Sequence, residues 1–165
     1  MKNIQTLISF ASVALCLIAP ASSHAESGTI DVLISTVSVL TSIPMGDTTV
    51  TSRSGTGTIT FTRSSGGPFV EGASGAAQFA SFSKKTATGF DLEADGLATF
   101  QSEDTLQLLF KRKSGDLAAG TSGEGTLQLT GGPGRFSGVN GQCKYKVENL
   151  PGNWQVTIGK CQWSR

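Results

Sequence analysis

Residues 125–141 read GTLQLTGGPGRFSGVNG and carry the clearest fold signal in the chain. Leu127 and Leu129 alternate with polar residues, which is the pattern of a strand with one buried face. The glycines and the proline that follow break this strand, because glycine adopts positive φ without strain and proline lacks an amide donor. We therefore predict a strand, a glycine-rich corner pinned to the core by Phe136 and Val139, and a second strand that leaves the corner.

The first part of the chain has the pattern of a secretory signal. Lys2 supplies a positive charge, residues 7–19 form a short apolar run, and residues 23–25 form a small-x-small cleavage site. The apolar run is too short to cross a bilayer easily, so we predict no stable membrane span. The interpretation is a signal peptide over 1–25 and a single domain over 26–165, secreted or periplasmic, in a chain of 165 residues.

Removal of that segment would change the chemistry available to the protein. The only histidine of the chain is His24, so residues 26–165 lack the imidazole of Ser/His or Cys/His catalysis and of histidine metal sites. We predict no metal and no cofactor, and we assign no catalytic residue. Two cysteines remain, Cys143 and Cys161, and export to an oxidising compartment predicts that they form a disulfide.

Charge and composition exclude some functions and favour a fold class. The formal net charge is +1, which gives no electrostatic reason to expect nucleic acid or an acidic membrane as partner. The basic cluster at 111–113 is divided between two faces by strand alternation, so it forms no nucleic-acid patch. Glycine, serine and threonine are abundant and only 15% of residues are charged, which is typical of a turn-rich all-β domain.

Alternating patterns and turn residues divide the domain into strands without a convincing helix. The predicted strands are 29–41, 58–62, 73–83, 90–101, 105–113, 123–130, 142–149 and 154–163. A change of apolar parity in the first strand predicts a bulge near residues 35–36, and residues 42–56 are expected to be a loop or an irregular edge. Consecutive hairpins favour an all-β, eight-stranded antiparallel up-and-down β-barrel, which can hold one small ligand.

Two hairpins have a predicted register. If the hairpin over 90–113 is centred on Glu103, Asp95 lies opposite Lys111 on the solvent-exposed face of the hairpin. The last hairpin turns at residues 150–153, and a centre at Gly152 places the two cysteines of the domain directly opposite each other. Their disulfide would stabilise the fold by roughly 3 kcal/mol. The last strand is expected to pack through its apolar residues Trp154, Val156 and Ile158.

The glycine corner resembles a known family. Residues 123–141 are similar to the run G-x-G-T-Y-x-x-x-G-G-T-G-R-F-x-G-x-x-G of bacterial allene oxide cyclase barrel-like proteins, which are calycin-type barrels. The motif residues are Gly131, Gly132, Gly134, Arg135, Phe136, Gly138 and Gly141. The resemblance extends over about residues 90–150 and implies an eight-stranded barrel with an apolar cavity. It supplies no catalytic residue, because the polar positions of the plant cyclases cannot be matched here.

Several side chains could belong to a site, and each has a structural alternative. Arg135 could bind an anionic ligand, but the carbonyls freed at a broken strand favour hydrogen bonds to them. Trp154 and Trp163 could stack on a sugar or lipid, but core or barrel-end packing is the more common role of tryptophan. The carboxylates at residues 91, 93 and 95 share one strand face, where lysine partners are favoured over calcium.

The function predicted from these features is the binding of a small apolar ligand inside the barrel. Two alternatives stay open. One is a structural or interaction protein of the cell envelope with a side-chain-filled barrel. The other is a cyclase or isomerase acting on an apolar substrate, which needs an inward carboxylate such as Glu71, Glu93 or Glu148. The oligomeric state stays open.

Overall fold

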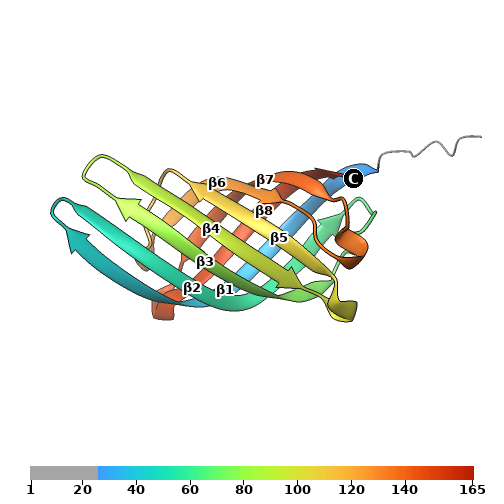
Figure 1. The fold of residues 1–165 in the computed structure, drawn as a ribbon, viewed down its shortest axis with the longest axis horizontal. Coiled ribbons are helices and arrows are strands. Elements are labelled where there is room, and N and C mark those ends of the chain that lie inside the picture. Colours follow the sequence, from blue (N-terminus) through green and yellow to red (C-terminus); the bar gives the residue numbers. More distant parts are fainter. Residues whose placement is uncertain (1–25) are drawn as a thin grey trace, which may run out of the picture.

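A computed structural model describes residues 26–165, which form a closed barrel of eight strands (Figure 1). Each strand pairs antiparallel with the next, and the last pairs with the first, so the predicted up-and-down barrel is confirmed. The strands are β1 (Ser27–Met45), β2 (Thr48–Ser64), β3 (Ser74–Lys85), β4 (Phe90–Thr99), β5 (Thr105–Arg112), β6 (Ser122–Leu129), β7 (Asn140–Asn149) and β8 (Trp154–Ser164). The predicted signal peptide lies outside the described residues.

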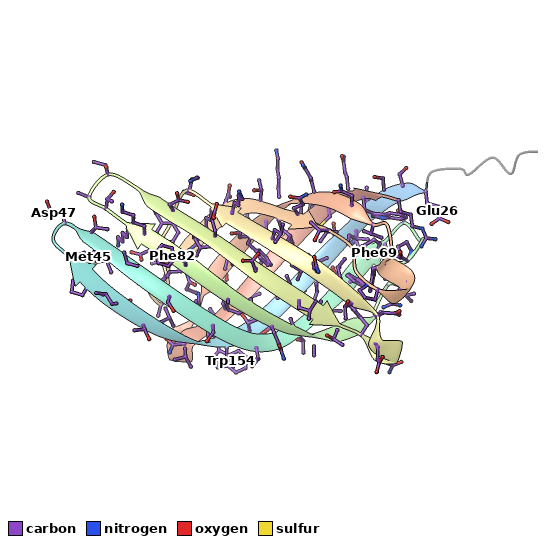
Figure 2. The ribbon with its side chains drawn as sticks, in the orientation of Figure 1. Glu26, Met45, Asp47, Phe69, Phe82 and Trp154 are labelled. Carbon is purple, nitrogen blue, oxygen red and sulfur yellow. A yellow bond between two sulfur atoms is a disulfide. The ribbon has the colours of Figure 1, made fainter. Side chains whose placement is uncertain are left out.

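One end of the barrel is filled with aromatic side chains. Figure 1 shows the C-terminus at this end and the β1–β2 and β3–β4 hairpins at the other. Phe61 stacks on Phe100 and meets the edge of Phe69, with ring centroids 5.1 Å apart in both pairs. Phe136 and Trp163 pack around them and are also buried. We call this the closed end and the opposite end the hairpin end; Figure 2 shows Phe69 at the former and Met45 and Asp47 at the latter.

The glycine corner lies between β6 and β7, at the closed end. Positive φ angles occur at Gly131, Gly134 and Gly138. Phe136 and Val139 are buried in the core, which confirms that they pin the corner. The corner also lies very close to the neighbouring β5, because a Cβ atom added to Gly132 would be 2.1 Å from the carbonyl oxygen of Thr105. Glycine is therefore required there by close approach of two backbones.

The last hairpin has the predicted register. Cys143 lies directly opposite Cys161, and the two form a disulfide with their Cα atoms 3.9 Å apart. The expected packing of β8 is wrong, however. Trp154 and Ile158 are 48% and 55% exposed on the outside of the barrel. The inward side chains of β8 are those of odd-numbered residues, and both Cys161 and Trp163 lie on this buried face.

The β4–β5 hairpin keeps its predicted faces but not its predicted partners. Glu93, rather than Asp95, lies opposite Lys111, so the register is displaced by two residues. The connection is longer than predicted, because residues 100–104, which include a single turn of 3-10 helix at Gln101–Glu103, separate the two strands. Opposite charges still meet on the wet face, since the Lys111 Nζ lies 3.3 Å from the Glu93 Oε1. A displacement by two residues preserves strand parity, which explains why the charge pattern survives.

The region predicted as a loop, residues 42–56, is a long β-hairpin. β1 continues to Met45 and β2 begins at Thr48, so only a tight turn separates them. Pro44 is tolerated because β8 pairs with β1 only as far as Val37, and beyond that point β1 has a free edge. The serine and threonine residues that suggested a loop are strand residues here.

The predicted bulge at residues 35–36 is also wrong. The register of β1 against β2 shifts between Asp31 and Val32 instead. β1 keeps one parity throughout, so that Ile34, Thr36 and Ser38 all face the interior and are buried. The inner face of β1 changes from apolar to polar along the strand, and apolar parity alone cannot detect this change.

Candidate functional site

The half of the barrel toward the hairpin end contains a cavity of about 50 Å³. A water molecule needs roughly 10–15 Å³ of such volume, so the cavity can hold several waters or a small organic group. Much of its wall is apolar and comes from β1 and β3–β5, with Ile34, Ala77, Phe79, Leu92, Ala94, Leu108 and Phe110. Polar side chains complete the wall, namely Thr36, Arg53, Gln78, Ser81, Arg112, Tyr145, Gln155 and Thr157.

Arg112 of β5 is the most deeply buried polar side chain of the cavity, with 1% of its surface exposed. Its guanidinium carbon lies 4.8 Å from the centre of the Phe90 ring, and its Nη2 donates a hydrogen bond of 3.0 Å to the backbone oxygen of Asp116. The Nε and Nη1 atoms of Arg112 are buried without a hydrogen-bond partner. Buried donors without partners are rare, because leaving one unpaired costs about 1–3 kcal/mol.

The place of Arg112 depends on a neighbouring glycine. A Cβ atom added to Gly123 of β6 would lie 2.6 Å from the Arg112 Nη1 and 2.9 Å from its Cδ. Any larger residue at this inward-facing position would occupy the space of the guanidinium. The pair Arg112 and Gly123 therefore forms one local arrangement, with the arginine lying in the gap that the glycine leaves.

Arg53 of β2 is the second buried arginine, with 3% of its surface exposed. Its Nε donates a hydrogen bond of 2.6 Å to the Ser38 Oγ, which in turn donates to the backbone oxygen of Asn153 at 3.2 Å. Burial, with a smaller effect from the charge of Arg112, lowers the pKa of Arg53 to about 10. This pKa is well above neutrality, so Arg53 stays protonated at physiological pH.

The two buried guanidinium groups have no carboxylate partner in residues 26–165. The ion pairs of this part of the chain join other residues, and its buried side chains include no aspartate or glutamate. The acid whose charge acts on Arg112 is Asp116, whose carboxylate accepts hydrogen bonds from the Lys85 Nζ and from the backbone N–H of Leu117. Burial lowers the pKa of Arg112, as expected for a desolvated cation.

Tyr145 of β7 supplies a further polar group at the same cavity. Its ring is buried and meets the edge of Phe110, with centroids 5.6 Å apart. Burial raises the pKa of Tyr145, and the nearby charge of Arg112 opposes this rise. The hydroxyl therefore remains protonated at neutral pH and can donate a hydrogen bond.

The carboxylates considered for a cyclase or isomerase lie elsewhere. Glu71, Glu93 and Glu148 are all exposed, so none of them reaches the cavity. Glu93 pairs with Lys111 of β5 and Asp91 pairs with Lys113, which directly follows β5, and this confirms the predicted solvated face. Residues 26–165 contain no group of three or more histidine, cysteine, aspartate or glutamate residues arranged to hold a metal.

Arg135 has a different partner from the one expected. Its Nε lies 3.4 Å from the Asp104 Oδ2, and its guanidinium carbon lies 5.1 Å from the Phe100 ring and 4.8 Å from the Phe136 ring. The backbone N–H of Arg135 donates to the Asp104 Oδ1 at 3.0 Å. The arginine thus fastens the glycine corner to the β4–β5 connection through a carboxylate, rather than through freed carbonyls. Of the two tryptophans, Trp163 fills the closed end as expected.

The sequence pattern did not predict the two cavity arginines, although for Arg112 it contains an indication. Arg112 shares the parity of Leu108 and Phe110, so the pattern places a charged residue on the apolar face of its strand. For Arg53 there is no such indication, because its segment was expected to be a loop. A charge on a buried strand face indicates either a paired structural ion or a binding site.

No helix in the described part of the chain is both long and apolar enough to span a bilayer. No protein-family model, no curated protein and no solved structure matches this sequence or its fold.

Proposed function

We propose that this barrel binds a small molecule with an apolar body in the cavity near its hairpin end. The observation that carries the proposal is the division of the interior. The closed end is filled by aromatic rings, whereas the other half retains a cavity whose apolar wall is interrupted by a few buried polar groups. Ligand sites generally combine an apolar wall with a small number of placed polar groups.

The resemblance to allene oxide cyclase barrel-like proteins supports the same proposal. The motif residues 131–141 belong to the glycine corner, and none of them lines the cavity. The motif is therefore a marker of the barrel rather than of its chemistry. We place the protein in an extracellular or periplasmic compartment, and the Cys143–Cys161 disulfide supports this placement because such bonds persist under oxidising conditions.

The proposal is tested by occupying the cavity with a side chain. Ala94 lines the cavity, so Ala94→Leu should fill much of it, whereas Ala80→Leu places the same group on the exposed face of the adjacent β3. NMR titrations of the purified protein with hexanoate and 1-hexanol should show binding at the cavity in the wild type and in Ala80→Leu. Binding should be lost in Ala94→Leu. Equal binding by both variants would contradict the proposal.

One observation favours the second candidate, an interaction protein. The outer face of β1 and β8 carries neighbouring apolar side chains, since Val37 lies opposite Trp154 and both are more than one-third exposed. Val39 and Ile158 extend this apolar surface. Sedimentation velocity of the wild type and of Trp154→Lys tests it: self-association that the lysine abolishes supports an interface between copies, and a monomer at all concentrations contradicts it.

A further inference from the structure

We propose that the ligand of this cavity is an organic acid whose carboxylate is held by Arg53 and Arg112. The inference rests on the proposed function and adds the chemical class of the ligand. Both arginines line the cavity and are almost fully buried, and two nitrogens of Arg112 lack a hydrogen-bond partner. These features give the site two positive charges and unpartnered donors, and neither arginine forms an ion pair with a carboxylate of residues 26–165.

Two buried cations without an ion-pair partner destabilise the folded state unless an anion binds beside them. Transfer of a cation from water to a protein interior is strongly unfavourable even after relaxation, and pairing with an anion is the usual compensation. Arg53 is compensated by the neutral hydroxyl of Ser38 and by the Phe79 ring, whose centre lies 6.0 Å from its guanidinium carbon. Arg112 is compensated by one backbone oxygen, by the ring of Phe90 and by the charge of Asp116, with which it forms no ion pair. A bound anion would supply the missing charge and accept hydrogen bonds from the unpartnered donors.

The guanidinium of Arg112 is held in place before any ligand binds. It lies in the gap left by Gly123, stacks on Phe90, and is hydrogen-bonded by one nitrogen to the Asp116 backbone. The Nε and Nη1 atoms have no hydrogen-bond partner in the described structure. A donor that is already fixed loses little conformational freedom on binding, so more of the charge–charge attraction appears as affinity.

The size and wall of the cavity favour a carboxylate over a larger anion. About 50 Å³ accommodates a planar head group and a few carbons, and the side chains of Ile34, Ala94 and Leu108 offer apolar contact to those carbons. A carboxylate matches the planar guanidinium geometry and carries one charge, while the Tyr145 hydroxyl in the same wall can donate to it. A phosphate would need more donors around its tetrahedral oxygens.

The decisive experiment compares probes that share an alkyl chain and differ in the head group. Purified wild-type protein is titrated at neutral pH with hexanoate, 1-hexanol, hexylammonium and inorganic phosphate, with NMR shifts locating the binding site. Hexanoate should bind at the cavity about tenfold or more tightly than 1-hexanol, and hexylammonium should not bind. Added salt should weaken hexanoate binding more than 1-hexanol binding.

Substitutions of the arginines provide the matched test. Arg112→Met and Arg53→Met should each remove most of the preference for hexanoate over 1-hexanol, and Arg112→Lys should retain part of it. Arg63→Met makes the same change at an exposed position of β2 and should keep the full preference. The charge of Arg112 forms no ion pair, so Arg112→Met should leave the unfolding midpoint unchanged or raise it. If Arg112 had a purely structural role, the same substitution would lower the midpoint.

Each outcome separates this inference from the function on which it rests. If 1-hexanol binds as tightly as hexanoate, the carboxylate assignment is overturned and the cavity remains a ligand site. Tighter binding of phosphate than of hexanoate overturns the assignment as well. If neither six-carbon probe binds, the proposed function and the inference both fall. Should an arginine variant fail to fold, the wild-type comparison of hexanoate with 1-hexanol decides alone.

Discussion

Removal of the Cys143–Cys161 disulfide should destabilise the barrel by an amount that the structure allows us to estimate. The bond joins residues separated by 18 positions in the sequence, across β7 and β8. The chain-entropy relation for a loop of this length gives about 3 kcal/mol at 25 °C, and a loss of this size should lower the melting temperature by about 10 °C in a domain of this size. Both cysteines are buried, so alanine is the appropriate replacement because serine would add an unpaired hydroxyl.

The assay is urea unfolding of the wild type and of the double variant Cys143→Ala/Cys161→Ala, followed by far-ultraviolet circular dichroism. The double variant should unfold at lower urea, and the wild type with reductant should lose a similar free energy of unfolding. Hydrogen exchange should show faster opening of β8 than of β4 in the variant. A loss below about 1 kcal/mol would refute the reasoning, since it would mean that the rest of the sheet already restrains these strands.

Three further predictions concern packing and pH. Phe136→Ala should lower the free energy of unfolding by about 3–5 kcal/mol, because the Phe136 ring is fully buried. As a control in the same urea assay, Phe82→Ala should change it by less than about 0.5 kcal/mol, because the Phe82 ring is 56% exposed. Gly123→Ala should lower the melting temperature, because the new methyl group would collide with the buried guanidinium beside it; an unchanged value would contradict the described packing. The pKa of Asp116 lies below its usual value, chiefly because Lys85 donates a hydrogen bond to its carboxylate. The ionised Asp116 therefore stabilises the fold above the unfolded pKa near 4, and this stabilisation is lost as the pH falls through the folded pKa. Asp116→Asn should flatten that part of the acid-unfolding profile.

Local signals predicted those parts of the fold in which two independent features agreed. The β7–β8 register followed from a turn at Gly152 together with a pair of cysteines equally spaced from it. The β4–β5 hairpin had only alternation and charge, which determine the face of each residue but not its partner. Its register therefore lies two residues away from the prediction, because the connection with its 3-10 turn takes up residues 100–104 rather than 102–104.

The candidate site could not be predicted in the same way. Apolar residues indicate the inner face of a strand, but the inner face near the hairpin end is partly polar, with Thr36, Ser38 and Arg53 pointing inward. Each of these residues has a hydrophilic side chain in an otherwise acceptable strand. Their burial depends on closure of the barrel around them, which is a property of all eight strands together and of no single window of sequence.

Closure between the first and the last strand has a consequence for how this protein folds. β1 pairs with β8 from Ser27 opposite Ser164 to Val37 opposite Trp154, so the contacts that close the ring join residues more than a hundred positions apart. Such contacts appear late, because the entropy of closing a long loop must be overcome first, and all-β chains with high contact order fold in milliseconds to seconds. Until β8 arrives, β1 and β7 each present an open edge to other chains. The period between synthesis of β7 and docking of β8 is therefore when the nascent chain is most exposed to aggregation.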